Sequence, residues 1–470
     1  MKRVFVFIVL MTGLLPFCTA GAEEKTALYP AQGENGKMGY IDRTGIWVIP
    51  PRFDFAGDFC GDYAEVSIYP EDYDPQTDGP LEPDDCDGII DRRGDFVLPP
   101  AYSLLMGEGS SDFGGNETGI WLVHRRADNL WGLDEEGEEI LLRRAQYGFF
   151  DIPSGCFSGL KWDDVWHLYS DSRLIPVVDD HRVGYADRST GETVIPCQYY
   201  DLDPDNFHEG VASVAFMDDD GNPLDFFLID ETGAEIPLPE GLHSLYASCA
   251  SEGRIQVENE KKLEGYADLR GNVVIPPQFL RAGEFQDGIA SVRFREGDWG
   301  FIDREGNTMC RGLMSDSPFL GPNCRRGVFV LTNERSACTV YTVTGEELFT
   351  FSGETEIFDL HPPMKNGLCW FYEYEKGTGF LWGLVNLRGE TVSEAQWLLN
   401  DYERMDFPDD LQLVMKDGKW GYIDETGEVA LPLIYDRAYN FKNGLARVRI
   451  GNRCGYIDHD GREVFFWNAE

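Results

Sequence analysis

The sequence predicts an all-β protein built from tandem β-hairpin repeats of about 35–50 residues. A phrase of the form aromatic-Gly-aromatic-Ile-Asp-x-x-Gly recurs along the chain, as in "KWGYIDETGEVALP" (419–432) and "KMGYIDRTGIWVIPP" (37–51). A short β-branched, Pro-terminated stretch follows the best copies, as in "VVIP" (273–276). No stretch shows a convincing apolar stripe at the 3.6-residue spacing of an amphipathic helix.

Each copy predicts a hairpin. In "GYIDETGEVAL" (421–431), strand-forming residues precede Asp424, and Gly427 comes three residues after it. Asp at the first and Gly at the fourth position indicate a type I turn, and this Gly can take the positive φ of a bulged hairpin. The returning strand ends at Pro, which has no N–H to donate to a ladder. The Gly beside the aromatic residue lets a neighbouring strand approach closely or bulge.

A third segment follows the best copies, as in "FDFAGDF" (53–59), "FLRAGEFQDGIASV" (279–292) and "YDRAYNFKNGLARV" (435–448). Its aromatic residues punctuate a loop, Gly288 or Gly444 makes a turn, and the apolar alternation after the turn predicts a further strand. We expect each unit to contain three or four strands.

The copies number about eleven. Clear ones are anchored at Gly39, Gly132, Gly184, Gly265, Gly300, Gly383, Gly421 and Gly455, and weaker ones at Gly88, Phe226 and Val340. Such units bury their faces by stacking on their neighbours, so we expect propeller-like blades or an open curved β-array. Eleven exceeds the usual maximum of about eight blades in a ring, which leaves two closed rings or one open array as the expected arrangements.

These phrases resemble the bacterial WG repeat, also called the KWG repeat. The full pattern is present in the copies that begin near residues 37, 182, 264 and 419, and it is degenerate near 86, 130, 226, 338 and 381. Similar phrases extend from residue 37 to 464. The resemblance implies an exported or surface-associated bacterial protein whose repeats mediate binding. It carries no catalytic residues, so no catalytic, cofactor-binding or metal-binding residue is assigned.

The domain organisation follows from the copies. We predict a signal peptide at 1–22, N-terminal repeats with acidic insertions at 23–180, central repeats at 181–308, a degenerate region at 309–380 and C-terminal repeats at 381–470. A charged start, an apolar run of about a dozen residues and "AGA" at 20–22 are typical of a cleaved signal. The run is shorter than the roughly 20 residues that a spanning helix needs. A secreted or extracytoplasmic location follows, with a retained anchor as the alternative.

The chain is strongly acidic, with a formal net charge of −43 at pH 7. Such a charge argues against nucleic acid and anionic membranes as partners, because both are polyanions. An aromatic content of 13% is too high for a disordered acidic chain. The sequence therefore predicts a folded acidic protein.

Ten of the eleven cysteines lie beyond the predicted signal, scattered singly and without a C-x-x-C pair. This spacing argues against a zinc site. Cys60–Cys86 is one candidate disulfide, and Cys454 stands where another copy has Trp420, as a small buried hydrophobe would.

Three acidic segments, at 70–88, 201–206 and 218–223, have the oxygen-rich composition that calcium prefers. None has the spacing of an EF-hand loop, so we expect solvated loops, with a calcium site as the alternative. We expect no cofactor.

Aromatic residues could also form a glycan platform. Trp131, Trp299, Trp382 and Trp420 lie at repeat positions, where a core is expected. Trp162, Trp166, Trp370 and Trp397 are out of register; local packing is favoured for them too, and an exposed platform is the alternative. The seven histidines lie outside any known catalytic motif, and we expect them to be ordinary surface residues.

The leading hypothesis is a secreted, non-enzymatic repeat scaffold that binds a protein or a cell-envelope component. A cell-surface carbohydrate-binding protein is the first alternative, and a glycosidase-like enzyme on a propeller is the second. Convergent polar residues in one pocket would indicate the enzyme. Exposed ring pairs would indicate glycan binding, and an apolar or charge-patterned patch would indicate a protein partner.

Overall fold

The computed structural model describes residues 26–71, 73, 85–106, 119–125, 130–133, 139–143, 146–166, 172–200, 206–216, 218, 224, 226–244, 250–313, 323–325, 327–332, 337–352, 358–361, 364, 366–399, 407 and 410–468. Their regular secondary structure consists entirely of strands in antiparallel sheets, and no helix occurs among them. The predicted signal peptide lies outside the described residues. The all-β prediction is confirmed.

Apart from one two-stranded sheet, the described strands form eleven units, numbered here along the chain; units 2 and 3 belong to one seven-stranded sheet, because their neighbouring strands pair. Unit 1 contains β1 (Tyr29–Gln32), β2 (Met38–Ile41) and β3 (Trp47–Phe53). Unit 2 contains β4 (Phe55–Ala56), β5 (Tyr63–Ser67), β6 (Asp87–Asp91) and β7 (Phe96–Met106). Unit 3 contains β8 (Ile120–His124), β11 (Tyr147–Asp151) and β12 (Cys156–Phe157), and unit 4 contains β13 (Asp164–Val165), β14 (Leu174–Asp179), β15 (Arg182–Asp187) and β16 (Thr193–Tyr200).

Unit 5 contains β17 (Val211–Val214), β18 (Phe227–Asp230) and β19 (Glu235–Ile236). Unit 6 contains β20 (Leu242–Ser244), β21 (Ile255–Asn259), β22 (Glu264–Ala267) and β23 (Val273–Phe279), and unit 7 contains β24 (Arg281–Gln286), β25 (Ile289–Arg295), β26 (Asp298–Asp303) and β27 (Thr308–Leu313). Unit 8 contains β28 (Asn323–Arg325), β29 (Val328–Thr332), β30 (Ala337–Thr342) and β31 (Glu347–Ser352).

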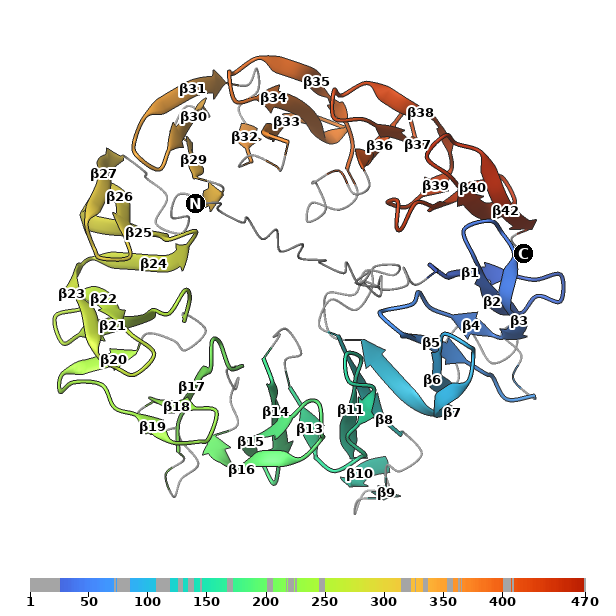
Figure 1. The fold of residues 1–470 in the computed structure, drawn as a ribbon, viewed down its shortest axis with the longest axis horizontal. Helices are drawn as coiled ribbons and strands as arrows, with labels where there is room; N and C mark the ends of the chain where they lie inside the picture. The colour runs from blue at the N-terminus through green and yellow to red at the C-terminus, as the bar shows by residue number, and fades with distance from the viewer. Residues whose placement is uncertain are drawn as a thin grey trace, which may run out of the picture.

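Unit 9 contains β32 (Phe358–Leu360), β33 (Leu368–Glu375), β34 (Gly379–Asn386) and β35 (Thr391–Trp397). Unit 10 contains β36 (Gln412–Lys416), β37 (Lys419–Ile423) and β38 (Val429–Tyr435), and unit 11 contains β39 (Arg437–Ala438), β40 (Ala446–Ile450), β41 (Arg453–Ile457) and β42 (Glu463–Asn468). In units such as 7, 9 and 11 the first strand lies towards the middle of the molecule and the last at its rim (Figure 1).

The repeat glycine permits a bulge in the outermost strand. In unit 6, Glu264 pairs with Phe279 and Tyr266 with Ile275, so the one residue between the pairs on β22 faces three on β23. A Cβ on Gly265, which lies between them, would sit 2.5 Å from the carbonyl oxygen of Ile275 and 2.6 Å from the nitrogen of Pro277. Backbone cannot yield to such a contact, so this position requires glycine. The predicted close approach is confirmed.

The Asp-x-x-Gly turns also form as predicted. In unit 1, Gly45 has φ +82° and its N–H donates to the carbonyl of Asp42. The Asp42 carboxylate accepts the backbone N–H groups of Thr44 and Ile46 and the Thr44 hydroxyl. The aspartate therefore accepts hydrogen bonds from N–H groups of the turn that do not pair with a neighbouring strand.

The third segment belongs to the following unit. After β38 of unit 10 the chain enters β39 and β40, which pair with β41 of unit 11. The predicted further strand exists, but it does not complete the sheet of its own hairpin. Each sequence repeat therefore straddles two sheets and ties them covalently.

The prediction of a repeat hairpin anchored at Gly132 is wrong. Its residues form β9 (Leu130–Leu133), which pairs only with β10 (Glu139–Arg143) in a separate two-stranded sheet. The place of the repeat hairpin in unit 3 is taken by "YGFFDIPSG" (147–155), where a Cβ on Gly148 would lie 2.1 Å from the carbonyl oxygen of Gly159. Gly148, not Gly132, is therefore the repeat glycine of unit 3.

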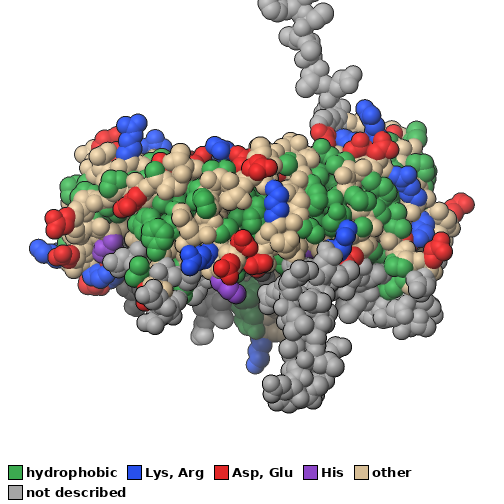
Figure 2. Space-filling view, turned by 90° about the horizontal axis from the view of Figure 1, so that it is seen from below, with side chains coloured by type: hydrophobic (Ala, Val, Ile, Leu, Met, Phe, Trp, Pro, Cys, Tyr) green, Lys and Arg blue, Asp and Glu red, His purple; other side chains and the backbone are tan. Residues whose placement is uncertain are grey.

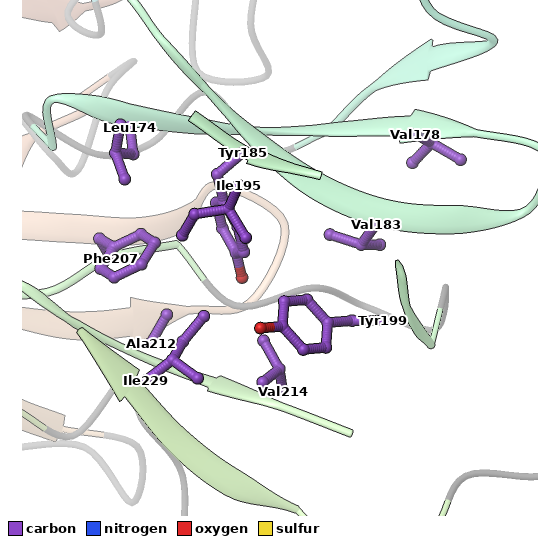
Figure 3. Close-up of a cluster of buried hydrophobic side chains, with 10 residues drawn as sticks. All are labelled: Leu174, Val178, Val183, Tyr185, Ile195, Tyr199, Phe207, Ala212, Val214 and Ile229. Atoms are coloured by element: carbon purple, nitrogen blue, oxygen red, sulfur yellow. The ribbon is translucent and has the colours of Figure 1, made fainter. Parts of the chain in front are cut away.

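Buried aromatic residues join each unit to the next. Tyr266 of unit 6 donates its hydroxyl to the carbonyl of Gly283 in unit 7 at 2.6 Å, and its ring centroid lies 4.8 Å from that of Phe285. Tyr40 and Tyr422 donate in the same way to a carbonyl 17 residues later. Apolar side chains fill the rest of each interface, as Figure 3 shows for units 4 and 5.

The same device closes the molecule into a single ring. Tyr456 of unit 11 donates its hydroxyl to the carbonyl of Pro30 in unit 1 at 2.9 Å, across 426 positions of sequence. Its ring centroid lies 5.4 Å from that of Tyr29, and both residues share one buried cluster with Ile41 and Leu445. Unit 11 accordingly sits beside unit 1 in Figure 1. The predicted propeller-like arrangement of blades is confirmed. The eleven units of the described residues close into one ring, instead of the two rings or the open array that were expected.

The cysteines bear on the predicted disulfide. Cys60 and Cys86 each keep a thiol, so the candidate pair does not form. Cys454, predicted to be a small buried residue, is only partly buried.

Within the described ranges, no helix is long and apolar enough to cross a membrane.

Candidate binding surface

The tryptophans out of register are mostly buried. Trp162, Trp370 and Trp397 have at most 4% of their surface exposed, and Trp166 is partly buried. Each of the three belongs to an interface cluster, Trp162 between units 3 and 4 and the other two between units 9 and 10. The predicted packing is confirmed, and these residues do not form an exposed platform.

The repeat-position tryptophans behave as expected. Trp299 and Trp382 are buried, and Trp420 is half-buried against the cluster between units 10 and 11. The side chain of Trp131 lies outside the described residues.

The histidines required one correction. His124 is buried, with its ring 5.1 Å from that of Tyr147, at the end of β8, which lies between two other strands of its sheet. His181, His243 and His459 are exposed as predicted, and His208 and His361 are partly buried. His167 lies outside the described residues.

The acidic segments proposed as calcium loops lie largely outside the described residues. Of residues 70–88, those from 74 to 84 are not described, nor are 201–205 and 219–223. Among the residues that the structure does describe, no group of three or more His, Cys, Asp or Glu side chains is placed to hold a metal ion.

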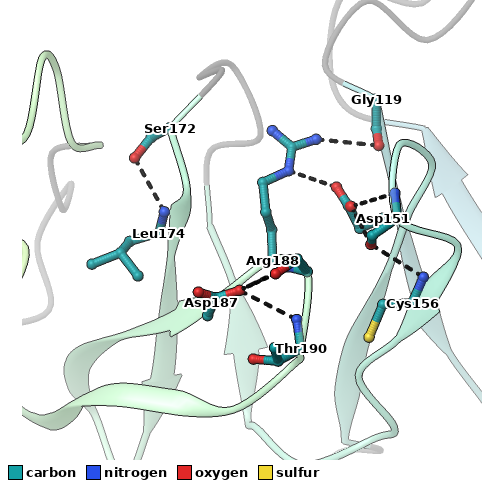
Figure 4. A network of polar contacts seen from close by, with 10 residues as sticks. Gly119, Asp151, Cys156, Ser172, Leu174, Asp187, Arg188 and Thr190 are labelled. Atoms are coloured by element: carbon teal, nitrogen blue, oxygen red, sulfur yellow. Dashed lines mark hydrogen bonds and ion pairs between the residues drawn. The ribbon is translucent and has the colours of Figure 1, made fainter.

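A buried ion pair joins units 3 and 4 (Figure 4). Asp151 is 1% exposed and accepts a hydrogen bond from Nε of Arg188 at 2.5 Å. Nη2 of Arg188 also donates to the carbonyl of Gly119, and the second carboxylate oxygen of Asp151 accepts the N–H of Ser154. The pair is therefore well satisfied, which burial of two charges requires.

Cys156 lies in the same turn as Asp151. Burial raises the pKa of the Cys156 thiol, and the neighbouring negative charge of Asp151 raises it further. A raised pKa leaves less thiolate at neutral pH, and the thiolate is the nucleophile. This group of residues is suited to holding two units together rather than to nucleophilic chemistry.

The outermost strands expose apolar residues at the rim. Val48 of β3, Val194 of β16 and Val274 of β23 are 37–46% exposed. Single exposed apolar residues are common on soluble proteins. A proline follows two residues later in each strand (Pro50, Pro196 and Pro276), and proline on an edge strand hinders pairing with another chain. These residues alone do not define a binding site.

Three exposed apolar residues lie beside strands β17 and β18 of unit 5. Phe216, Leu224 and Phe226 are 44%, 51% and 56% exposed. We call these three residues the unit 5 patch. The N–H of Leu224 donates to the carbonyl of Phe216 at 2.8 Å, which places both strands of the hairpin together at this point. A side view of the rim shows hydrophobic side chains among charged ones (Figure 2).

One residue of the patch, Phe216, packs on a buried ring and on a partly buried ring. The ring of Phe216 lies 5.4 Å from that of Tyr199 on β16 and 5.3 Å from that of Phe227 on β18. Tyr199 and Phe227 in turn belong to the core between units 4 and 5. An exposed apolar surface held rigidly by a core is typical of an interaction site.

A second exposed ring pair occurs in unit 9. Tyr374 and Phe380 are 39% and 40% exposed, and their centroids lie 5.4 Å apart with the planes at 63°. The rings meet edge to face and do not present one flat surface.

Comparison with known families identifies the repeat. The family described as WG containing repeat matches residues 38–68, 184–219, 265–296 and 420–454. The chain carries WG repeats. Each match begins on the third strand of one four-stranded unit, or on its equivalent, and extends into the next unit, so the WG repeat and the structural unit are out of phase. The four matched regions coincide with the four copies predicted to be complete.

Three solved structures match this chain, each at low sequence identity. A eukaryotic initiation factor matches at 9% identity and a TM-score of 0.36, covering 78% of this chain and 95% of its own. BamB from Moraxella catarrhalis matches at 12% and 0.26, covering 87% and 94%. The computationally designed Ika8 protein matches at 11% and 0.29, covering 65% and 95%. No curated protein matches the sequence.

The unit 5 patch was missed at the level of sequence. Its residues stand in "AFMDDDGNPLDFF" (215–227), where an apolar residue flanks an acidic turn on each side. That pattern also fits the inward residues of an ordinary hairpin, so only the structure distinguishes exposed from buried positions.

Proposed function

We propose that this WG-repeat protein is a non-enzymatic binding scaffold that is exported and engages a protein or a cell-envelope component. The observation that carries the proposal is the unit 5 patch, because its three large apolar side chains are about half exposed and one of them, Phe216, packs on the core, which favours burial against a partner. Export rests on the N-terminal sequence at 1–22. The absence of a catalytic motif from the sequence supports a non-enzymatic role.

The ring suits such a role because it holds loops and hairpins on a fixed frame. Successive units share buried tyrosines and apolar clusters, and repeat proteins of this kind present extended surfaces for binding. Binding residues on a rigid scaffold lose little conformational entropy when a partner arrives.

Co-sedimentation tests the proposal. Isolated bacterial envelopes, intact or treated with protease, would be mixed with purified protein and pelleted. We expect Phe216→Ser with Phe226→Ser to reduce the pelleted fraction severalfold, and Ile46→Ser, at a 65% exposed apolar residue of unit 1, to leave it unchanged. Equal pelleting of the three proteins would refute a binding role for the patch.

Carbohydrate binding is the second candidate, and the exposed Tyr374–Phe380 pair favours it. An aromatic ring can stack on the apolar face of a sugar. Pelleting with insoluble cell-wall polysaccharide, with and without calcium, tests it: Tyr374→Ala with Phe380→Ala should abolish binding. If those substitutions have no effect on pelleting, the ring pair does not bind that polysaccharide.

A further inference from the structure

Two buried carboxylates face each other beside the junction of units 6 and 7. Glu258 of β21 and Glu264 of β22 are directly opposed in the antiparallel register, and they are 8% and 2% exposed. Opposed residues on neighbouring strands have Cβ atoms about 5 Å apart, and like charges placed in this way repel each other. In three other units the residue before the repeat glycine is a tryptophan (Trp299, Trp382 and Trp420). Unit 6 therefore has a second buried carboxylate where these units have an apolar ring.

Glu264 connects the two units. Its Oε2 accepts the backbone N–H of Ala282 at 2.5 Å, and its Oε1 lies 3.2 Å from Nη1 of Arg281, both on β24 of unit 7. The Arg281 side chain is 65% exposed, and an ion pair with an exposed partner contributes little because water screens it. On the other side of β22, the opposed residue is the uncharged Phe279 of β23. The charge of Glu264 is therefore opposed by Glu258 and only weakly compensated.

Glu258 has cationic partners of its own. Its Oε1 lies 2.6 Å from Nζ of Lys262 and 3.0 Å from Nε2 of His243, which is opposite it on β20. Burial acts to raise the pKa of Glu258, but the hydrogen bonds from Lys262 and His243 outweigh it and lower that pKa. Burial raises the pKa of Glu264, and the negative charge of Glu258 adds to the rise. As the pH falls, Glu264 therefore takes up a proton before Glu258 does.

We propose that Glu258 and Glu264 form a pH-sensitive pair that strengthens the junction of units 6 and 7 in mildly acidic surroundings. Glu264 takes a proton from solvent, and its neutral carboxyl donates a hydrogen bond to the carboxylate of Glu258. Its other oxygen continues to accept the N–H of Ala282. The repulsion between the two carboxylates then ends, while only the exposed contact with Arg281 is given up. This inference is independent of the proposed binding function.

The sign of the effect follows from the two states of the chain. The pKa of Glu264 is higher in the folded state than the value of about 4.3 expected in the unfolded state. Its contribution to stability is therefore complete below about pH 4.3, and it is lost as the pH rises through the folded-state pKa.

Urea denaturation of the full chain and of its Glu264→Gln variant, at pH 7 and at about pH 4.5, tests the proposal. Glutamine retains an oxygen for the N–H of Ala282 and offers an N–H to Glu258, so it imitates the protonated carboxyl. We expect Glu264→Gln to raise the urea midpoint at pH 7, and the difference between the two proteins to shrink to less than about half of that at the lower pH. Circular dichroism confirms that the variant is folded.

Glu252→Gln is the matched control. Glu252 also connects unit 6 to unit 7, because it accepts the N–H of Gly288 at 2.8 Å and pairs with Arg304 at 2.8 Å. Burial acts to raise the pKa of Glu252, but the hydrogen bonds from Arg304 and Gly288 outweigh it and lower that pKa. The same chemical change should therefore lower the urea midpoint at pH 7.

A second variant tests the pairing. In a chain that carries Glu258→Gln, the further change Glu264→Gln should raise the midpoint at pH 7 by less than it does in the native chain, because the opposing charge is gone. An equal gain in the two chains would overturn the pairing.

Two other results would overturn the proposal as a whole. If Glu264→Gln lowers the midpoint at pH 7, the contact with Arg281 outweighs the repulsion from Glu258. If the gain from Glu264→Gln is the same at both pH values, Glu264 does not titrate in this range.

Discussion

The repeat glycine is the residue on which each hairpin depends. At Gly265, a side chain would meet backbone on the bulged outer strand, and backbone atoms on both sides prevent a local adjustment. The residue is therefore fixed by its neighbours rather than by its own φ, which distinguishes it from the turn glycines at positive φ.

Gly265→Ala should lower the free energy of unfolding by about 3 kcal/mol or more, because it forces a shift of the Ile275 carbonyl. Urea denaturation measures the change. Gly57→Ala is a matched control, since its Cβ would come no nearer than 3.5 Å to another atom. Similar losses in the two variants would contradict this account of the glycine.

The turn aspartates predict an acid-sensitive ring. Hydrogen bonds from Thr44, Thr232, Asn272 and Asn307 are the first cause that lowers the pKa of Asp42, Asp230, Asp268 and Asp303, respectively. A lowered folded-state pKa means that the carboxylates stabilise the fold above the unfolded value of about 3.9, and that this contribution is lost as pH falls through the folded pKa.

We expect the midpoint of thermal unfolding to fall as the pH drops below about 4, and to fall less steeply when all four residues are changed to Asn. Differential scanning calorimetry at several pH values makes the comparison. Parallel curves for the two proteins would show that other groups control the acid response.

Individual residues show which features of the structure could be predicted from the sequence and which could not. The turn glycines and the bulge glycines were predictable because their neighbours repeat. Gly148 was not recognised as an anchor because no β-branched, Pro-terminated stretch follows its turn, whereas one follows the equally long turn of the Gly184 copy. Exposure of Phe226 was unpredictable because its neighbour Phe227 fits the buried position equally well.

At the scale of elements, the units are linked by contacts at their turns as well as by their cores. The buried pair of Asp151 and Arg188 is the clearest of these, because both groups are almost removed from water. This ion pair therefore holds a turn of unit 3 against a turn of unit 4.

Asp151→Ala should cost about 3–5 kcal/mol, because it leaves the Arg188 guanidinium buried without its counterion. Asp151→Leu combined with Arg188→Met should recover most of that loss, since an apolar pair of similar size carries no desolvation penalty. A double-mutant cycle by urea denaturation measures the coupling. A double variant as unstable as the single one would show that packing, not charge, controls this junction.

The boundaries of the elements explain a second difference from the sequence-based expectation. The repeat phrase is most easily recognised from its hairpin, so the sequence favours a unit that begins there. Hydrogen bonding instead starts each sheet at the preceding aromatic segment, as β39 and β40 do for unit 11. Periodicity fixes the length of a repeat but not its phase.

At the scale of the whole molecule, ring closure depends on an angle that no residue encodes alone. A small rotation between neighbouring units, added over eleven of them, decides whether the ends meet. The sequence therefore predicted stacking and left closure open. The decisive contacts, Tyr456 with Pro30 and Trp47 with Phe465, join residues that are remote in sequence.

Tyr456→Phe with Trp47→Ala should open the ring, because it removes a buried hydrogen bond and the indole packed on Phe465 at this interface. Small-angle scattering should then give a larger radius of gyration with an unchanged β-sheet signal in circular dichroism. Tyr266→Phe, which removes the equivalent hydroxyl between units 6 and 7, is the control and should leave the radius unchanged.

The junction of units 11 and 1 differs from the other ten in how it arises. At other junctions the contacting residues are close in sequence, as Tyr266 and Gly283 are, whereas here the partners lie 426 positions apart and are made at opposite ends of synthesis. Tyr29 is synthesised early and Tyr456 late. The surface of unit 1 that faces unit 11 therefore stays uncovered until almost the entire chain has been made. The export proposed above would therefore precede ring closure, since the last contact can form only when both ends of the chain are on the same side of a membrane.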